Sequence, residues 1–366
     1  MIQINKLERI AEEKGVDAVV IGSTDNIAYF LDVKVVGDAV LLLYFSRDRV
    51  ELYTPLLEYY RFRDTLPSDV EVYALSKTIK PIDAKVLDDD FKTIVKKIIE
   101  NHKKVGIDLS HNSPHTRVFT TLPQDKVVDV SDNIDRTRMI KEDWELDRIS
   151  RAIDTTGYCI YRLINNLNED TSETALAGLF EYEARQKGVE ELAFTPLTLF
   201  KPGNSYPHNL PSSRKIGSNN LILIDVGVKI ENRCSDITRM VIYGKLSDEE
   251  LRIIEVVEEA LNTAIHAIEP GVKAKDIDKA ARDVLEKHGL STRFIHGLGH
   301  GLGVNVHEPP YIRIGSETVI EPGMVFTIEP GIYFNGKFGV RLEEDIYVSK
   351  TKAVVLSKDI ERVFII

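Results

Sequence analysis

Acidic residues interrupt otherwise apolar segments in the C-terminal half of this 366-residue chain. Asp225 lies in LILIDVGV, Glu329 in VFTIEPGIYF and Glu343 in GVRLEEDIYV. Burying a carboxylate is costly unless a cation faces it, either a basic side chain or a metal ion. Arg341, two residues before Glu343, is one such cation, so a salt bridge and a metal site are both open for each glutamate.

A second aspartate, Asp236, follows Asp225 after the turn-like stretch ENRCS. Strand-like residues flank this stretch, and two strands joined in this way form a hairpin that could bring both carboxylates to one site. Taken singly, an aspartate at a strand end more often bonds to local backbone. The pair therefore indicates a site only in combination with further ligands.

Histidines gather in the segment FIHGLGHGLGVNVHEPP, which holds His296, His300 and His307, three of the nine in the chain. His296 and His300 are spaced like metal ligands on a helix, but the alternating glycines favour a loop or a strand. The zinc motif HExxH is absent. A glycine-rich turn with partly exposed histidines is the alternative interpretation.

Four carboxylates and one imidazole together make a coherent ligand set, which consists of Asp225, Asp236, His300, Glu329 and Glu343. Such a set suits divalent metals, and we expect Mn²⁺ or Co²⁺, with Zn²⁺ or Fe²⁺ as alternatives. Cys234 is the one thiol near these positions. Five side chains exceed the need of one ion, whereas two metals about 3.5–4 Å apart would use them all and activate water.

The elements that must position these residues indicate two domains. We expect a smaller N-terminal α/β domain over 1–133 and an α+β domain over 134–366 that holds a curved, mostly antiparallel sheet flanked by helices. In the first domain the pattern predicts helices at 6–14 and 91–104 and strands, separated by polar turns, at 16–22, 39–45, 49–55, 70–75 and 105–110.

In the second domain, apolar residues recur at three- and four-residue steps from 142 to 164, which predicts a long helix. Further helices are predicted at 174–188, 247–268 and 274–289. Strands are predicted at 220–230, 238–244, 324–334 and 339–349.

Composition and charge restrict the class of protein. The formal net charge of −11 argues against nucleic acid or an anionic membrane as a partner and favours a small or peptidic ligand. The chain has two cysteines, no apolar run long enough to span a membrane, and charged rather than signal-like first residues. We therefore expect a cytoplasmic protein.

Four motifs, in combination and order, resemble the pita-bread metallopeptidases, a family that includes Xaa-Pro dipeptidase (prolidase), Xaa-Pro aminopeptidase and methionine aminopeptidase. The motifs are IDVG with CSDITR, HGLGHGLGVNVHEPP, IEPGIY and GVRLEED, and the resemblance covers about residues 136–366. It implies a pita-bread fold for the C-terminal domain and a homodimer. The N-terminal third is similar, in general character, to the smaller domain of prolidases and aminopeptidases P.

The resemblance implies a role for each candidate ligand. Asp225 resembles the terminal ligand of one metal, and Asp236 and Glu343 resemble the carboxylates that both metals share. His300 and Glu329 resemble ligands of the second metal. The residue matching Glu329 is also expected to shuttle a proton from the attacking water.

The resemblance also implies residues that bind substrate. His208, in SYPHNLP, and His307 would bind the peptide and stabilise the tetrahedral intermediate, with His296 lining the pocket and Arg341 supporting the site. Prolidases commonly place an arginine soon after the third histidine motif, but here HEPP is followed by Tyr311, and Arg313 comes two residues later. Whether Arg313 binds the carboxylate of a dipeptide stays open at this point.

The activity implied is metal-dependent hydrolysis of the bond between an N-terminal residue and proline, with a dipeptidase favoured. A peptide with proline in the second position would be the substrate. The alternatives are a Xaa-Pro aminopeptidase that acts on longer peptides, and a binding homologue without enzymatic activity.

Overall fold

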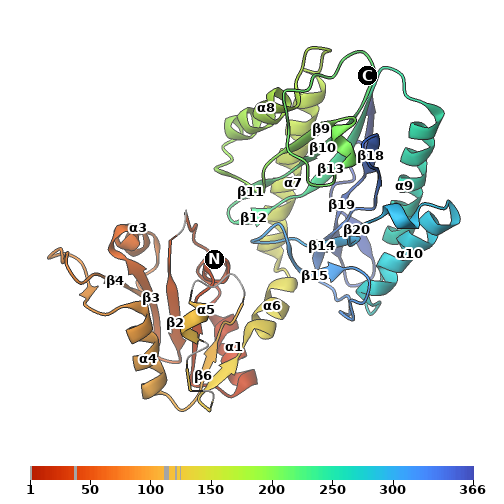
Figure 1. Cartoon of the computed structure of the whole chain (residues 1–366). Coiled ribbons are helices and arrows are strands. Elements are labelled where there is room, and N and C mark those ends of the chain that lie inside the picture. Colours follow the sequence, from red (N-terminus) through yellow and green to blue (C-terminus); the bar gives the residue numbers. More distant parts are fainter. Residues whose placement is uncertain (1, 37–38, 111–114, 120–121, 124) are drawn as a thin grey trace. The chain divides into compact units, whose positions relative to one another are not determined.

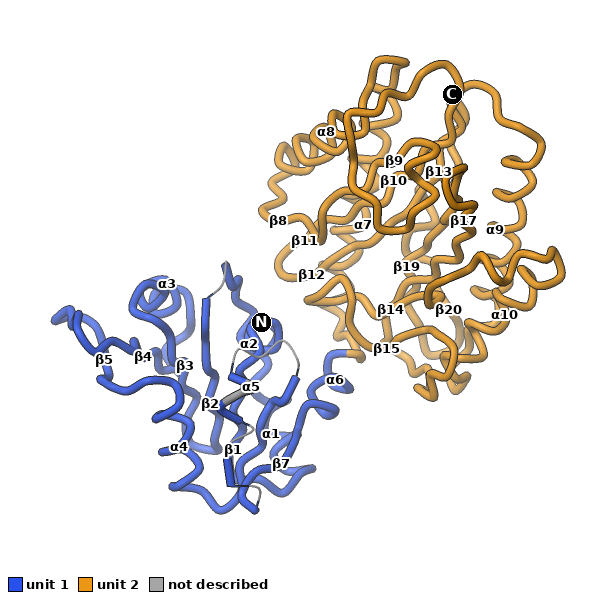
Figure 2. Tube along the Cα trace, viewed as in Figure 1, with its two compact units in different colours: residues 1–138 blue, residues 139–366 orange. Residues whose placement is uncertain are grey.

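The computed structural model describes residues 2–36, 39–110, 115–119, 122–123 and 125–366. The chain divides into two compact units, Met1–Arg138 and Met139–Ile366 (Figure 2). Our predicted boundary between residues 133 and 134 lies in the same helix, α6 (Ser131–Met139), as the division between the units. No helix in the described part of the chain is both long enough and apolar enough to cross a membrane.

The first unit is built on a mixed sheet of seven strands in the order β5-β4-β3-β2-β1-β6-β7. The interior strand β1, which lies between β2 and β6, is completely buried. Its strands are β1 (Ala18–Ile21), β2 (Leu42–Ser46), β3 (Arg49–Pro55), β4 (Val70–Leu75), β5 (Val86–Leu87), β6 (Val105–Ile107) and β7 (Val127–Asp129). Its helices are α1 (Ile4–Lys14), α2 (Thr24–Leu31), α3 (Leu56–Thr65), α4 (Phe91–Asn101), α5 (Thr116–Phe119) and α6.

The α/β character of this unit is confirmed, but the prediction of plain turns between its first strands is wrong. Helix α2 follows β1, and α3 follows β3. Ser23 caps α2 by accepting a hydrogen bond from the Asn26 N–H, at 3.5 Å. A short helix that is buried on nearly every side lacks the alternation of apolar and polar residues on which the sequence analysis relied.

The second unit places four long helices around several small sheets (Figure 1). The helices are α7 (Asp143–Ile164), α8 (Glu173–Gln186), α9 (Asp248–His266) and α10 (Ala274–Lys287). The sheets have the orders β21-β13-β10-β9, β12-β11-β8, β15-β14-β16-β19-β20 and β17-β18. Among the described residues of this second unit, all paired strands are antiparallel except β13 with β21, so the expected mostly antiparallel arrangement is confirmed.

The strands of this unit are short, and two 3-10 turns accompany them. The strands are β8 (Glu191–Leu192), β9 (Leu197–Phe200), β10 (Asn220–Val226), β11 (Val228–Ile230), β12 (Arg233–Cys234), β13 (Ile237–Tyr243), β14 (Gly299–Gly301), β15 (Glu308–Ile312), β16 (Val325–Ile328), β17 (Gly331–Phe334), β18 (Phe338–Arg341), β19 (Glu344–Val348), β20 (Ala353–Val355) and β21 (Val363–Ile365). The turns are η1 (Gly203–Ser205) and η2 (Ser291–Arg293).

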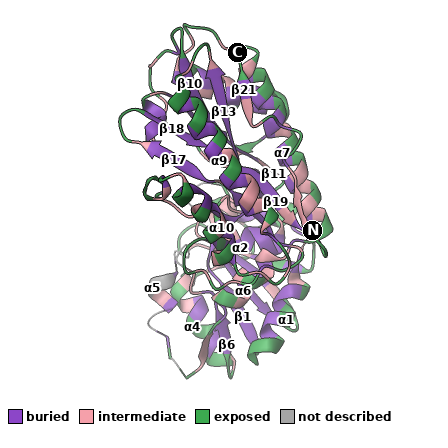
Figure 3. Cartoon of the chain, turned by 90° about the vertical axis from the view of Figure 1, so that its right-hand side faces the viewer, coloured by how far each residue is buried: buried purple, intermediate pink, exposed green. Residues whose placement is uncertain are grey.

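Strand β10 separates two hydrophobic cores. Figure 3 shows this strand coloured as buried. Leu221 and Leu223 pack into a core shared with α9 and α10, whereas Ile222 and Ile224 pack into a core shared with α7 and α8. Because side chains alternate between the two faces of a strand, every residue of β10 is buried. A charged residue on this strand therefore lies in an interior environment.

Three predicted long strands are each interrupted at or close to a candidate ligand. The predicted strand 324–334 ends as β16 at Ile328 and resumes as β17 at Gly331, because Glu329 and Pro330 lie between them. The predicted strand 339–349 is broken at Leu342 and Glu343, and the predicted strand 220–230 is broken at Gly227. Buried apolar residues lie shortly before and after each break, and they concealed the breaks in the sequence.

Candidate metal centre and substrate pocket

The two aspartates meet through the predicted hairpin. Asp225 on β10 pairs with Thr238 on β13, and Asp236 lies directly before β13. A side chain at Gly227 would meet the Ser235 carbonyl oxygen at 2.1 Å, so glycine allows the two strands to approach closely beyond Asp225. The hairpin prediction is confirmed.

The histidine segment is a loop and strand, as predicted, and not a helix. His300 lies on β14, where its backbone N–H donates to Thr327 Oγ1 at 3.2 Å. A Cβ at Gly299 would meet the Thr327 carbonyl oxygen at 1.9 Å. Glycine is therefore required for β14 to lie this close to β16, and this contact carries His300 toward the two glutamates.

Glu329 and Glu343 occupy the two strand breaks. The Glu329 N–H donates to the Leu298 carbonyl at 2.7 Å, and the Glu343 N–H donates to the Thr238 carbonyl at 3.3 Å. The Thr238 hydroxyl also donates to Glu343 Oε2 at 2.7 Å. The backbone of each glutamate is thus bonded to a residue that lies two positions from another candidate ligand, Leu298 from His300 and Thr238 from Asp236.

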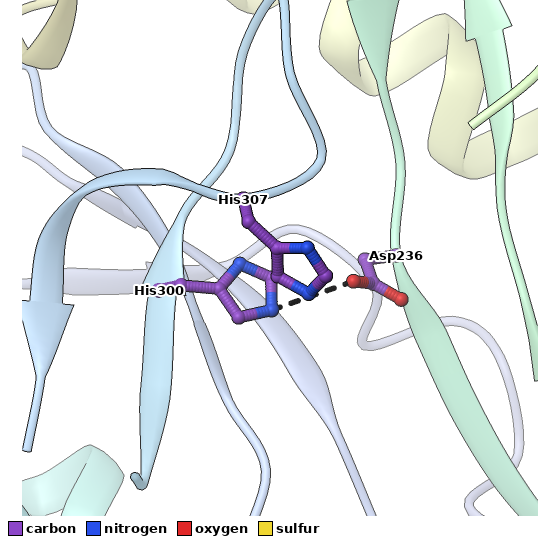
Figure 4. A group of neighbouring side chains, drawn as sticks. All are labelled: Asp236, His300 and His307. Atoms are coloured by element: carbon purple, nitrogen blue, oxygen red, sulfur yellow. Dashed lines mark ion pairs between the residues drawn. The ribbon is translucent and has the colours of Figure 1, made fainter. Parts of the chain in front are cut away.

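The five candidate ligands form one continuous cluster. Three overlapping groups each have ligand atoms within 4.8 Å of one another: Asp225, Asp236 and Glu343; His300, Glu329 and Glu343; and Asp236, His300 and His307. Figure 4 shows the third group, in which the His300 and His307 rings lie side by side and His300 points to Asp236. His300 Nε2 lies 3.5 Å from Asp236 Oδ2 and 3.3 Å from Glu329 Oε1.

The chemistry of these donors fits divalent metal ions. His300 Nδ1 lies 3.3 Å from the Gly301 carbonyl, which only accepts, so Nδ1 carries the proton and the bare Nε2 faces two carboxylates. Asp225 Oδ1 and Glu343 Oε1 are buried, and neither has a hydrogen-bond partner within the described ranges. Lone pairs gathered in this way repel one another unless cations lie between them.

Burial is the main cause of the shifted pKa values of three carboxyl groups in the cluster and of His300. Burial, followed by the charge of Glu343, raises the pKa of Asp236 and of Glu329 well above the usual carboxyl range. Burial, followed by the charge of Asp225, raises the pKa of Glu343 to about 7. Burial, followed by His307, lowers the pKa of His300 to about 3, so this imidazole is neutral at pH 7 and able to bind a metal.

A pocket of about 560 Å³ opens beside the cluster, and all ten candidate site residues line it. The non-ligand candidates among them are His208, His296, His307, Arg313 and Arg341. Its remaining walls are largely apolar and come from Phe194, Thr195, Leu197, Pro207, Leu210, Gly297, Gly299 and Tyr311. The pocket thus combines the cluster of carboxylates and His300 with apolar side chains and two arginines.

Arg341 is paired with an aspartate and only remotely with a glutamate. Its Nη2 donates to Asp225 Oδ2, and its Nε lies 3.9 Å from Glu329 Oε2. Two residues that the sequence analysis missed complete this network: Arg341 donates to the Tyr333 hydroxyl at 2.9 Å and to Thr238 Oγ1 at 3.2 Å. Their position, close after a candidate ligand in IEPGIY and CSDITR, was the available signal.

The cysteine considered as a ligand lies elsewhere. Cys234 is buried, and its thiol donates to the Val304 carbonyl at 3.6 Å. Burial raises the pKa of this thiol to about 12, which disfavours the thiolate that a metal would need. The candidate set therefore consists of carboxylates and imidazole alone.

Family models match both units of the chain. The model described as Metallopeptidase family M24 matches residues 147–350, and the model described as Creatinase/Prolidase N-terminal domain matches residues 3–140.

Individual relatives match over nearly the whole chain. A Xaa-Pro dipeptidase of Pyrococcus furiosus is 30% identical over 359 residues, which cover 97% of each chain. The crystal structure of a prolidase from Thermococcus sibiricus is 30% identical with a TM-score of 0.85, covering 99% of this chain and 97% of that one. The crystal structure of an X-Pro aminopeptidase from Thermotoga maritima is 27% identical with a TM-score of 0.86, and the match covers 100% of each chain.

Proposed function

Because the chain belongs to metallopeptidase family M24, we propose that it is a Xaa-Pro dipeptidase, which hydrolyses the bond between an N-terminal residue and proline. The observation that carries this proposal is the cluster of five candidate ligands at one end of an apolar pocket. The relative that matches 97% of the chain is named for the same activity.

We assign two divalent metal ions to the cluster, with Mn²⁺ or Co²⁺ expected and Zn²⁺ or Fe²⁺ as alternatives. Asp225 would hold one ion, His300 and Glu329 the other, and Asp236 and Glu343 would be shared by both. When bound, such a pair polarises the scissile carbonyl and activates water as a nucleophile. The unpartnered oxygens of Asp225 and Glu343 support this assignment.

The side chains of the pocket supply proton transfer and hydrogen bonds. Glu329, which lines the pocket, would accept the proton of the attacking water on Oε and pass it to the leaving amine. Burial lowers the pKa of His307, so at pH 7 this ring is neutral and has one N–H to donate. His307 and His208 would donate to the oxygen on which charge develops in the transition state.

The remaining walls suit a dipeptide that ends in proline. A proline ring has no backbone N–H to satisfy, so Phe194, Leu197 and Pro207 could enclose it without an unpaired donor. Arg313 lines the pocket, and we assign it the free carboxylate of the dipeptide. His296, which also lines the pocket, would contact the substrate from another side.

An X-Pro aminopeptidase is the second candidate function. The observation in its favour is Tyr311, which lines the pocket at the place where the resemblance leads one to expect an arginine for a dipeptide carboxylate. An enzyme for longer peptides does not need a cation at that place.

Kinetics with two substrates test the proposal. Purified protein supplied with Mn²⁺ or Co²⁺ is expected to hydrolyse a Xaa-Pro dipeptide with a higher kcat/KM than a Xaa-Pro-Pro tripeptide. A preference for the tripeptide would instead identify the aminopeptidase. Absence of both metal binding and hydrolysis would leave the binding homologue, and elemental analysis of the same sample decides this.

We further propose that the protein is a cytoplasmic homodimer; the family resemblance supports the dimer, and the low cysteine content and the charged first residues support the location. Sedimentation equilibrium tests the assembly, and cell fractionation tests the location. A monomer at micromolar concentration would contradict the first part of this proposal.

A further inference from the structure

His208 lines the pocket from a loop, and few contacts of its side chain hold its ring in place. The residue is exposed, although it lines the pocket. No side-chain hydrogen bond fixes the His208 ring among the residues that the structure describes. The backbone of residues 203–214, which we call the His208 loop, must therefore place this ring.

One buried carboxylate bonds both to the strand that leads into this loop and to the last residues of the loop. The Glu173 side chain, at the first position of α8, is completely buried. Its Oε1 accepts from the Phe200 N–H at 2.7 Å and from Arg214 Nη1 at 3.1 Å. Its Oε2 accepts from the Ser212 N–H at 2.9 Å and the Ser212 hydroxyl at 2.5 Å.

Backbone bonds join the same two segments. The Glu173 N–H donates to the Arg214 carbonyl, and the Thr174 N–H donates to the Ser212 carbonyl, both at 3.0 Å. The Thr198 hydroxyl donates to the Glu173 carbonyl at 2.7 Å. The first turn of α8 is thus bonded both to β9, which leads into the loop, and to the end of the loop.

Gly203 makes room for the cation of this cluster. A Cβ at Gly203 would lie 2.2 Å from Arg214 Nη1 and 3.0 Å from Glu173 Oε1. A larger residue would displace the guanidinium, which is the flexible end of a side chain, from the carboxylate. Gly203, the first residue of the loop, therefore allows the guanidinium of Arg214, its last residue, to reach Glu173.

We infer that Glu173 is a positioning residue for the reaction, which holds the His208 loop so that His208 faces the pocket. Four donors converge on a carboxylate that lies outside the pocket lining, and these donors come from the strand that leads into the His208 loop and from the end of that loop. A buried carboxylate satisfied in this way resists displacement, because breaking the set would leave charge or N–H groups unpaired. This inference rests on the proposed function only for the role of His208.

Two variants and one matched control test the inference. Glu173→Gln places an amide nitrogen where one of the N–H donors now points, and Arg214→Met removes the cation from a side chain that is 37% exposed. Asp170→Asn is the control, because it breaks the exposed 2.7 Å ion pair with Lys215, which joins the same two segments at the surface. Arg214→Met keeps the test valid if Glu173→Gln does not fold.

The first readout is hydrogen exchange and does not depend on activity. In Glu173→Gln and Arg214→Met, amides of residues 203–214 are expected to exchange faster, while those of Asp170→Asn are expected to match the wild type. Unchanged exchange in both variants would overturn the inference, whether or not the protein cleaves Xaa-Pro peptides.

The second readout is kinetic and uses the metal-loaded enzyme. A misplaced transition-state donor lowers kcat more than it raises KM, and we expect kcat/KM to fall by about 10- to 100-fold in Glu173→Gln. The double variant Glu173→Gln/His208→Ala is expected to be within about twofold of His208→Ala alone. Losses that multiply would mean that Glu173 acts on the enzyme by another route, and would overturn the inference.

Discussion

Arg341 donates from Nη2 to Oδ2 of Asp225, while Oδ1 of the same carboxylate is buried and has no hydrogen-bond partner in the described part of the chain. A second guanidinium nitrogen, Nη1, donates to the Tyr333 hydroxyl at 2.9 Å. Arg341 thus fixes the orientation of Asp225 and leaves one of its oxygens for a ligand.

This relationship predicts that Arg341→Met weakens metal binding although Arg341 is not a ligand. Loss of a partner that orients a metal ligand typically costs about 10- to 100-fold in affinity, and we expect a loss of that size for Mn²⁺. Titration calorimetry of the metal-free protein measures it. Tyr333→Phe is the control, because it leaves the bond to Asp225 in place and should cost less. Equal losses in the two variants would contradict the prediction.

Glu343→Gln is predicted to change thermal stability in opposite directions with and without metal. The folded-state pKa of Glu343, about 7, lies above its unfolded value, so the ionised form destabilises the metal-free protein as pH rises from about 4.3 to 7. At pH 8 in EDTA, Glu343→Gln should therefore raise Tm. With saturating Mn²⁺ it should lower Tm, because a ligand is lost.

Differential scanning fluorimetry at pH 5 and pH 8 measures the direction of this change in Tm. At pH 5 in EDTA the difference in Tm between variant and wild type should shrink, because the wild-type carboxyl is then largely protonated. Glu343→Ala should lose metal and nearly all activity while the fold remains. A metal-free Glu343→Gln protein less stable than the wild type at pH 8 would contradict the raised pKa of Glu343, whereas an active Glu343→Ala protein would show that the ligand set is misassigned.

Lys141 and Glu308 form a buried ion pair next to His307, with Nζ and Oε1 at 2.8 Å and both side chains at most 3% exposed. Glu308 Oε2 also accepts from the Asn305 N–H at 3.3 Å, within the segment that carries His307. Lys141→Met is predicted to cost about 3–5 kcal/mol, because it leaves a buried carboxylate without its ammonium partner. Urea unfolding of the metal-loaded protein measures this free energy.

The matched comparison is the exposed pair Lys279 and Asp283 on α10. Lys279→Met is expected to cost about 0–1 kcal/mol. The double variant Lys141→Met/Glu308→Gln should recover a large part of the loss of Lys141→Met. A loss in Lys141→Met no larger than that in Lys279→Met would contradict the prediction.

The candidate ligands could be located from the sequence because a carboxylate within an apolar run conflicts with burial, and this conflict is visible without a structure. The supporting residues could not be found in this way. Glu173 follows the cap Ser172 and looks like an ordinary acid in the first turn of a helix, which is usually solvated. Only the fold brings Phe200, Ser212 and Arg214 around it.

Strand boundaries at the site were hidden for a related reason. Buried apolar residues stand directly before Glu329 and Glu343, and apolar residues resume within three positions after each, so each segment was predicted as one strand. Proline at 330 was a signal of the first break, since proline cannot donate to a strand ladder. Leu342 gave no such signal for the second.

Arg313 is predicted to distinguish substrates with a carboxylate directly after proline from longer ones. Its guanidinium lines the pocket and lies 5.2 Å from the centre of the Tyr311 ring, which could hold it in place. A charged hydrogen bond contributes about 1.5–3 kcal/mol, so Arg313→Ala should raise KM for a Xaa-Pro dipeptide by roughly 10- to 100-fold. KM for a Xaa-Pro-Pro tripeptide should change little. Steady-state kinetics with both peptides measure the difference, and Arg252→Ala, an exposed change on α9, is the control. An equal effect on both substrates would mean that Arg313 does not bind the terminal carboxylate.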